Sequence, residues 1–154
     1  MSAGLPLTLS FARALLGRKV VIGQPVVEWA SEICHCSTHE AIGFGVEEDG
    51  KLIAGVVFNE YNGANINMHV ASDGSKRWMT KQLLWMVFDY AFNQAKVKRI
   101  TGLVASNNIA ARKFDEHIGF VHETTLVGAH PEGDLIVYRM FKSDCRWLKD
   151  SDEI

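Results

Sequence analysis

Cysteine, net charge and long apolar runs are all scarce in this 154-residue chain. No apolar run approaches the roughly 20 residues that a membrane-spanning helix needs, which argues against a membrane partner. The formal net charge of −2 gives no reason to expect nucleic acid or an anionic membrane surface as a partner. Residues 1–17 lack a basic start followed by a continuous apolar core, so they do not resemble a signal peptide. We therefore expect a cytoplasmic protein.

The three cysteines are Cys34, Cys36 and Cys145, an odd number that argues against a disulfide framework. Cys34 and Cys36 lie close to His39, and this cluster raises the alternative of a zinc-linked regulatory domain. The two cysteines are spaced more tightly than in usual structural zinc sites, and no second pair of ligands follows nearby. We therefore expect no metal, and we interpret these side chains as ordinary groups at a helix end and in a loop.

The length is that of one domain, which we expect to span residues 1–154. Asp49-Gly50 separates two β-prone runs and predicts a hairpin between them. Helices and strands then alternate, and this order predicts an α/β fold with a mixed sheet and helices on both faces. The expected strands are residues 41–48, 51–60, 65–72, 99–104, 120–126 and 134–142, and the expected helices are residues 26–36, starting just after Pro25, 78–94 and 109–118.

The most informative segment is residues 104–120, where an apolar strand ends in Asn107-Asn108 and a helix follows that stops at Gly119. Ligands of α/β proteins gather just beyond the ends of such strands. Asn is also a good residue for the N-cap of a helix. We favour a ligand-holding role for Asn108 over capping alone, and both interpretations stay open at this stage.

Asn108-x-x-Ala111 followed by Gly119-Phe120 resembles the GNAT superfamily of acyl-CoA N-acyltransferases. The segment 66–84 is similar to the strand, pyrophosphate loop and helix of that family. Residues 134–148 look most like the branch that contains ribosomal-protein and other N-terminal-amine acetyltransferases and their phage-encoded relatives. The resemblance implies a mostly antiparallel sheet, acetyl-CoA as cosubstrate, an amine acceptor on a small molecule or a protein, and a plausible homodimer.

The segment at the expected pyrophosphate loop departs from the family pattern, because both of its usual glycines are missing. Glycines let backbone N–H groups approach a phosphate closely. The N-terminus of the following helix still favours an anion, and Lys76 and Arg77 add side-chain charge. The residues that the resemblance assigns to cofactor binding are Val70, Ala71, Ser72, Ser75, Lys76, Arg77, Trp78, Met79, Thr80, Asn107 and Asn108.

Acetyl transfer to an amine needs a base, a donor for the carbonyl oxygen and a proton for the departing thiolate. His69 is the first candidate for the base because its ordinary pKa is near neutrality, and Glu60 is the rival. The resemblance places the oxygen's donor on a backbone N–H near Val70 or Ala71. Ser106 is a candidate for contact with the thiolate.

The usual proton donor of the family, a tyrosine, is replaced by Asp115, so the sequence offers no acid in the expected place. No Ser-His-Asp or Cys-His nucleophile arrangement is visible in the sequence, which favours direct attack of the amine on the thioester. The resemblance therefore implies an acetyl-CoA-dependent N-acetyltransferase. The alternative on the same fold is a module that binds CoA without turnover or that serves only in protein interaction.

Overall fold

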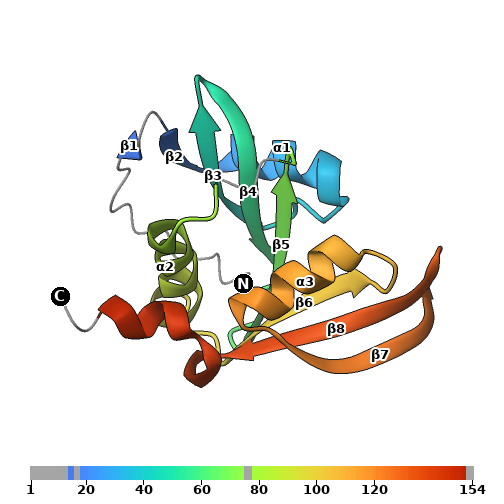
Figure 1. Ribbon diagram of the computed structural model, residues 1–154. Helices are drawn as coiled ribbons and strands as arrows, with labels where there is room; N and C mark the ends of the chain where they lie inside the picture. The colour runs from blue at the N-terminus through green and yellow to red at the C-terminus, as the bar shows by residue number, and fades with distance from the viewer. Residues whose placement is uncertain (1–13, 16–17, 75–77, 152–154) are drawn as a thin grey trace.

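The computed structural model describes residues 14–15, 18–74 and 78–151, and within them eight strands form one sheet (Figure 1). The strand order is β1-β2-β3-β4-β5-β6-β8-β7, and every neighbouring pair is antiparallel except β5 and β6. The mixed sheet predicted from the sequence is thus confirmed. The strands are β1 (Ala14–Leu15), β2 (Arg18–Ile22), β3 (Ile42–Glu48), β4 (Lys51–Asn59), β5 (Asn65–Ser72), β6 (Arg99–Ala105), β7 (Val121–His130) and β8 (Gly133–Phe141).

The helices cover both faces of the sheet, as expected. They are α1 (Gln24–Cys34), α2 (Lys81–Asp89), the π-helical turn η1 (Tyr90–Gln94), α3 (Ile109–Ile118) and the short 3-10 turns η2 (Lys142–Asp144) and η3 (Arg146–Ser151). The larger core cluster joins α2 and α3 to one face of the sheet. The smaller cluster, formed by Ala30, Val57 and Ala71, lies on the opposite face beneath α1.

Several predicted boundaries were wrong. Helix α1 begins at Gln24 and holds Pro25 in its first turn, where the missing N–H of proline costs nothing. The single helix expected over residues 78–94 begins only at Lys81 and ends in a π-helical turn, in which the N–H of Ala95 donates to the carbonyl of Tyr90 at 2.8 Å. Strands β1 and β2 were not predicted, and β7 continues to His130.

Helix α1 lies unusually close to the sheet because three glycines face it. A Cβ atom built on Gly43, Gly45 or Gly55 would lie 2.9–3.0 Å from side-chain atoms of Val26. Val26 itself is fully buried. Glycine is therefore required here for close approach, and it fixes the distance between α1 and strands β3 and β4.

We expect Gly45→Ala to destabilise the fold by about 1–3 kcal/mol, because overpacking a tight contact costs that much. The new methyl group would lie 2.9 Å from Cγ2 and 3.1 Å from Cγ1 of Val26. Urea unfolding measures the change. Val26→Ala removes both of those atoms. The loss of unfolding free energy in the double variant should therefore be smaller than the sum of the losses in the two single variants. Strict additivity would contradict the proposed contact.

Candidate active site

The central feature of the site is a gap in the sheet between β5 and β6. The two strands pair only over Asn65–Asn67 and Arg99–Thr101. Beyond these residues, β5 stays paired with β4 as far as Ser72, and β6 stays paired with β8 as far as Ala105. Beyond this point β5 is therefore paired only with β4, and β6 only with β8. The arrows of β5 and β6 diverge in Figure 1.

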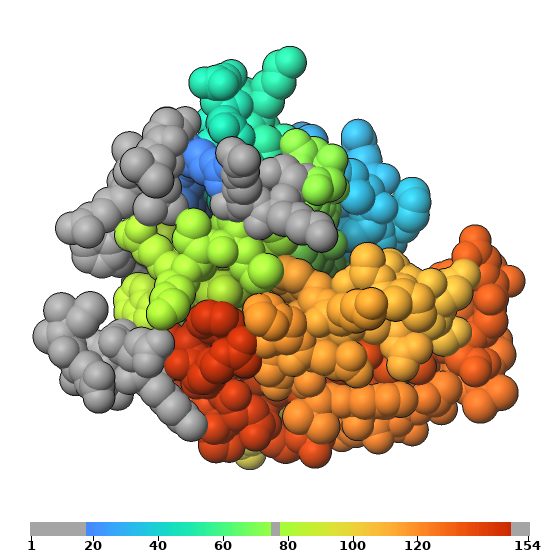
Figure 2. Space-filling model, viewed as in Figure 1, coloured from blue at the N-terminus to red at the C-terminus, as the bar shows by residue number. Residues whose placement is uncertain are grey.

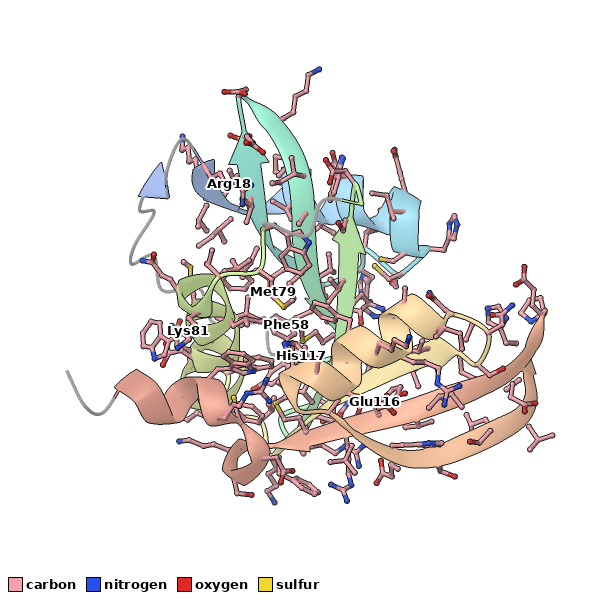
Figure 3. The ribbon with its side chains drawn as sticks, in the orientation of Figure 1. Arg18, Phe58, Met79, Lys81, Glu116 and His117 are labelled. Atoms are coloured by element: carbon pink, nitrogen blue, oxygen red, sulfur yellow. The ribbon has the colours of Figure 1, made fainter. Side chains whose placement is uncertain are left out.

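The gap opens into a cleft of about 1150 Å³. Residues 33–36, at the end of α1 and just after it, line one side, and α3 with the segment before α2 lines the other. Met79 and His117, labelled in Figure 3, reach the cleft from the segment before α2 and from α3. The surface in Figure 2 is indented between α1 and the tip of the β7–β8 ribbon. His130 at that tip also lines the cleft.

The backbone of β5 presents donors to this cleft in a regular alternation. The N–H of Asp73 donates to the carbonyl of Ile53 on β4 at 2.9 Å. Because backbone groups alternate in direction along a strand, the N–H groups of residues 71 and 69 also point toward β4. The N–H of Val70 therefore points into the cleft. Of the two donors expected for the carbonyl oxygen, the geometry favours Val70 over Ala71.

His69 lines the cleft and has a defined tautomer. Its Nε2 lies 2.9 Å from Oδ1 of Asn59, whose Nδ2 donates to the carbonyl of Ser37, also at 2.9 Å. Since the amide nitrogen of Asn59 faces a carbonyl, its oxygen must accept from His69, so Nε2 of His69 carries the proton. Nδ1 then has a free lone pair. Burial lowers the pKa of His69, partly opposed by the charge of Glu60, so the ring is neutral at pH 7.

Asp115 is a candidate functional residue that the sequence did not single out, because there it stood only in place of the family's tyrosine. It lies on α3 and lines the cleft. Its Oδ2 lies 3.4 Å from the place where a Cβ on Gly102 would stand, so the glycine leaves room for the carboxyl group. Burial raises the pKa of Asp115 to about 7, with a smaller contribution from the charge of Glu116. Near pH 7, a carboxyl group with that pKa holds its proton in about half of the protein molecules.

Asn107 and Asn108 make different contacts. Asn108 lines the cleft and also caps α3, because its Oδ1 accepts from the N–H of Ala111 at 3.2 Å. Asn107 donates to a carboxylate oxygen of Glu132 at 2.8 Å. Oγ of Ser106 accepts from the N–H of Asp134 at 3.3 Å. Asn107 and Ser106 lie outside the described lining of the cleft, so Asn108 is the member of this segment that faces it.

The expected cofactor residues before α2 are placed only in part, since Ser75, Lys76 and Arg77 lie outside the described residues. The ring of Trp78 is buried and stacks on Phe114 of α3 with 5.6 Å between the ring centroids. Thr80 is the N-cap of α2, and its hydroxyl accepts from the N–H of Leu83 at 3.1 Å. An aromatic stack thus connects α2 to α3 at the position where the family pattern has a glycine.

Among the other expected residues, Val70 and Ser72 line the cleft with His69. Ala71 is buried in the cluster beneath α1, on the same face of β5 as His69. Glu60 is exposed just beyond β4 in a left-handed backbone conformation, with φ of 53°. The described lining of the cleft includes neither Ala71 nor Glu60.

In the described part of the chain, no three His, Cys, Asp or Glu side chains are grouped closely enough to hold a metal ion. Cys34, Cys36 and His39 thus do not form the zinc site considered above. No helix in the described ranges is long and apolar enough to cross a membrane.

Comparison with known proteins places the geometry in context. Residues 22–130 match the family described as acetyltransferase (GNAT) domain. No curated protein sequence matches the chain. The ribosomal-protein-S5-alanine acetyltransferase from Vibrio fischeri superposes with a TM-score of 0.68 at 12% identity, over 89% of this chain and 100% of that one. Spermidine N-acetyltransferase from Vibrio cholerae, in complex with CoA and spermine, gives 0.60 at 22% identity over 76% and 73%. At these identities the similarity shows the fold alone.

The raised pKa of Asp115 carries a consequence for stability. In the unfolded chain the carboxyl group has its ordinary low pKa, so the folded protein binds more protons between about pH 4 and 7. The free-energy cost of burying the ionised carboxylate therefore grows, and the stability of the fold falls, as the pH rises through that window. We expect Asp115→Asn to stabilise the protein at pH 8 by about 2 kcal/mol more than at pH 5, measured by urea unfolding.

Asp49→Asn, at the exposed turn between β3 and β4, is the matched control for loss of one carboxylate. An effect of Asp115→Asn that is equal at both pH values would show that this carboxyl group is not desolvated.

Proposed function

The chain belongs to the GNAT family of acetyltransferases, and from that premise we propose that it transfers an acetyl group from acetyl-CoA to a primary amine by direct attack. The resemblance noted at Asn108, Ala111 and Gly119-Phe120 is thereby confirmed. The observation that carries the proposal is the gap between β5 and β6, which leaves backbone groups of β5 facing the cleft without a strand partner. Such groups require hydrogen-bond partners, and an extended amide-containing arm of acetyl-CoA supplies them.

The first catalytic group in the proposal is the N–H of Val70, which would donate to the thioester carbonyl oxygen. That oxygen becomes negatively charged as the amine attacks, and a fixed donor stabilises the charge. Ser72 and Asn108 line the same cleft and would contact the cofactor arm. Lys76 and Arg77 stay candidates for the phosphate groups, in keeping with the anion-favouring N-terminus of α2.

His69 is the proposed base, acting through Nδ1. The ring lies on the same face of β5 as Ala71, which packs beneath α1, so the amine would approach from the α1 side. The neutral ring can take a proton at pH 7, and its Nε2–H is held by Asn59. Glu60, the rival, is exposed and acts in this proposal only through its charge, which raises the pKa of His69.

Asp115 is the proposed acid, on the opposite face of the sheet from His69. As the new C–N bond forms and the C–S bond breaks, the amine gives a proton to Nδ1 of His69 and Asp115 gives its proton to the sulfur of CoA. One proton is taken up and one is released by the protein, and exchange with water restores both groups. A carboxyl group with a pKa of about 7 is suited to donate to a thiolate, whose conjugate thiol has a pKa near 8.5.

The pH dependence of kcat/KM tests the two roles together. Activity should rise as His69 loses its proton, below pH 6.5, and should fall as Asp115 loses its proton around pH 7. We expect Asp115→Asn to lower kcat by about 10²-fold and to remove the alkaline limb, while the Kd of acetyl-CoA measured by calorimetry stays unchanged. An alkaline limb that persists in the variant would exclude Asp115 as the acid.

The two candidate bases are separated by a matched pair of variants. His69→Ala should lower kcat at pH 7 by about 10²-fold with little change in acetyl-CoA affinity. Glu60→Gln should keep kcat within a few-fold and move the acidic limb to lower pH, because it removes the charge that raises the pKa of His69. The reverse pattern would make Glu60 the base. Acetyl-CoA binding without thiol release over a broad amine panel would instead favour the non-catalytic module.

A further inference from the structure

Two cysteine thiols lie in contact at the rim of the cleft. Cys34 is the last residue of α1, and Cys36 follows after one residue. Their Sγ atoms are 3.2 Å apart, and both residues line the cleft. Both are partly buried free cysteines. The mechanism proposed above uses neither thiol.

The backbone between the two thiols already has a conformation suited to a disulfide. His35 is the C-cap of α1 in the left-handed helical region, with φ of 55° and ψ of 37°, and its N–H donates to the carbonyl of Ser31 at 2.8 Å. A residue with helical angles of either hand holds its two neighbours with their Cα atoms about 5.4 Å apart, from standard helix dimensions. Disulfides span Cα separations of about 4.4–6.8 Å. The cysteines therefore need a small shift of the sulfurs and no refolding of the turn.

The turn that carries Cys36 is connected to His69 through the side chain of Asn59. The next residue, Ser37, accepts at its carbonyl from Nδ2 of Asn59 at 2.9 Å. Asn59 is only 2% exposed, and its Oδ1 accepts from His69 at 2.9 Å. Cys36 also packs on the small cluster beneath α1 that contains Val57, the residue opposite His69 on β4. A displacement at Cys36 thus reaches the His69 ring through one backbone carbonyl and one buried amide.

We propose that Cys34 and Cys36 form a reversible disulfide at the rim of the cleft, and that closing it repositions the His69 ring. The disulfide stands on the thiol geometry alone, and only its effect on catalysis rests on the proposed function. The oxidant is a low-molecular-weight disulfide such as oxidised glutathione. Closing the bond brings the sulfurs from 3.2 Å to about 2.05 Å.

The chemistry is two successive thiol–disulfide exchanges. The thiolate of Cys34 attacks one sulfur of the oxidant, whose S–S bond breaks and releases one thiol. Cys36 then loses its proton and attacks Sγ of Cys34, which releases the second thiol. The two cysteines are oxidised by two electrons and the oxidant is reduced to two thiols. Burial and the adjacent Cys34 thiol raise the pKa of Cys36 to about 12, which makes Cys36 the slower nucleophile and assigns the first attack to Cys34.

The test oxidises the protein with oxidised glutathione and reverses the reaction with dithiothreitol. Mass spectrometry should show loss of two hydrogen atoms in the peptide that holds both cysteines, and the ring signals of His69 should shift in NMR spectra. Acetyl transfer should fall by about tenfold or more, since displacements near 1 Å in a catalytic constellation carry large rate costs. Cys34→Ser and Cys36→Ser should abolish all three changes, while Cys145→Ser, at a buried position away from the cleft, should keep them.

Each outcome decides the question. A stable glutathione adduct or unmodified thiols would overturn the disulfide, and a disulfide that leaves the His69 signals unchanged would overturn the link to the site. A disulfide that shifts His69 in a protein with no acetyl transfer in either redox state would support this proposal and defeat the proposed function. Circular dichroism of both serine variants checks that they remain folded.

Discussion

The arrangement of the whole site depends on one constraint, the loss of hydrogen bonding between β5 and β6 beyond Asn67 and Thr101. An open pair of strands in the middle of a sheet is costly unless the outer edges are secured, and here β4 and β8 hold them. The opening exposes the N–H of Val70, admits side chains from both faces, and separates α3 from the end of α1. Without the divergence, His69 would be an ordinary strand residue, and Asp115 would lie on a helix that covers a closed sheet.

The two faces of the sheet are packed differently, and His69 and Asp115 lie on opposite sides of it. Beneath α1, glycines allow a close approach and leave a small cluster of Ala30, Val57 and Ala71. On the same face of β5 as Ala71, His69 is hydrogen-bonded to Asn59. On the other face, the large aromatic core supports α2 and α3, and Asp115 is desolvated at its edge. Burial acts on both groups, and it favours the neutral form of each. Near pH 7 the neutral histidine thereby keeps a proton on Nε2 alone, and the carboxyl group of Asp115 holds its proton in about half of the molecules.

The sequence predicted the elements whose signals are local and failed where tertiary packing decides. Asp49-Gly50 gave the correct hairpin and Gly119 the correct end of α3, because each occupies a conformation that its own residue type favours. Trp78, which the sequence placed inside the helix, lies before the N-cap Thr80 of α2 and stacks on Phe114, a contact between distant segments. His69 lines the cleft and stays a predicted base, and its tautomer depends on the contact with Asn59, which the sequence does not show. The raised pKa of Asp115 comes from desolvation, which a list of residue types does not show.

The cleft is lined from both faces of the sheet, by the end of α1 on one face and by α3 with the segment before α2 on the other. Under the proposed function, the amine and acetyl-CoA would therefore contact different helices and meet only in the gap between β5 and β6. Substitutions at the end of α1 would then change the choice of amine during evolution without disturbing the contacts that hold the common donor.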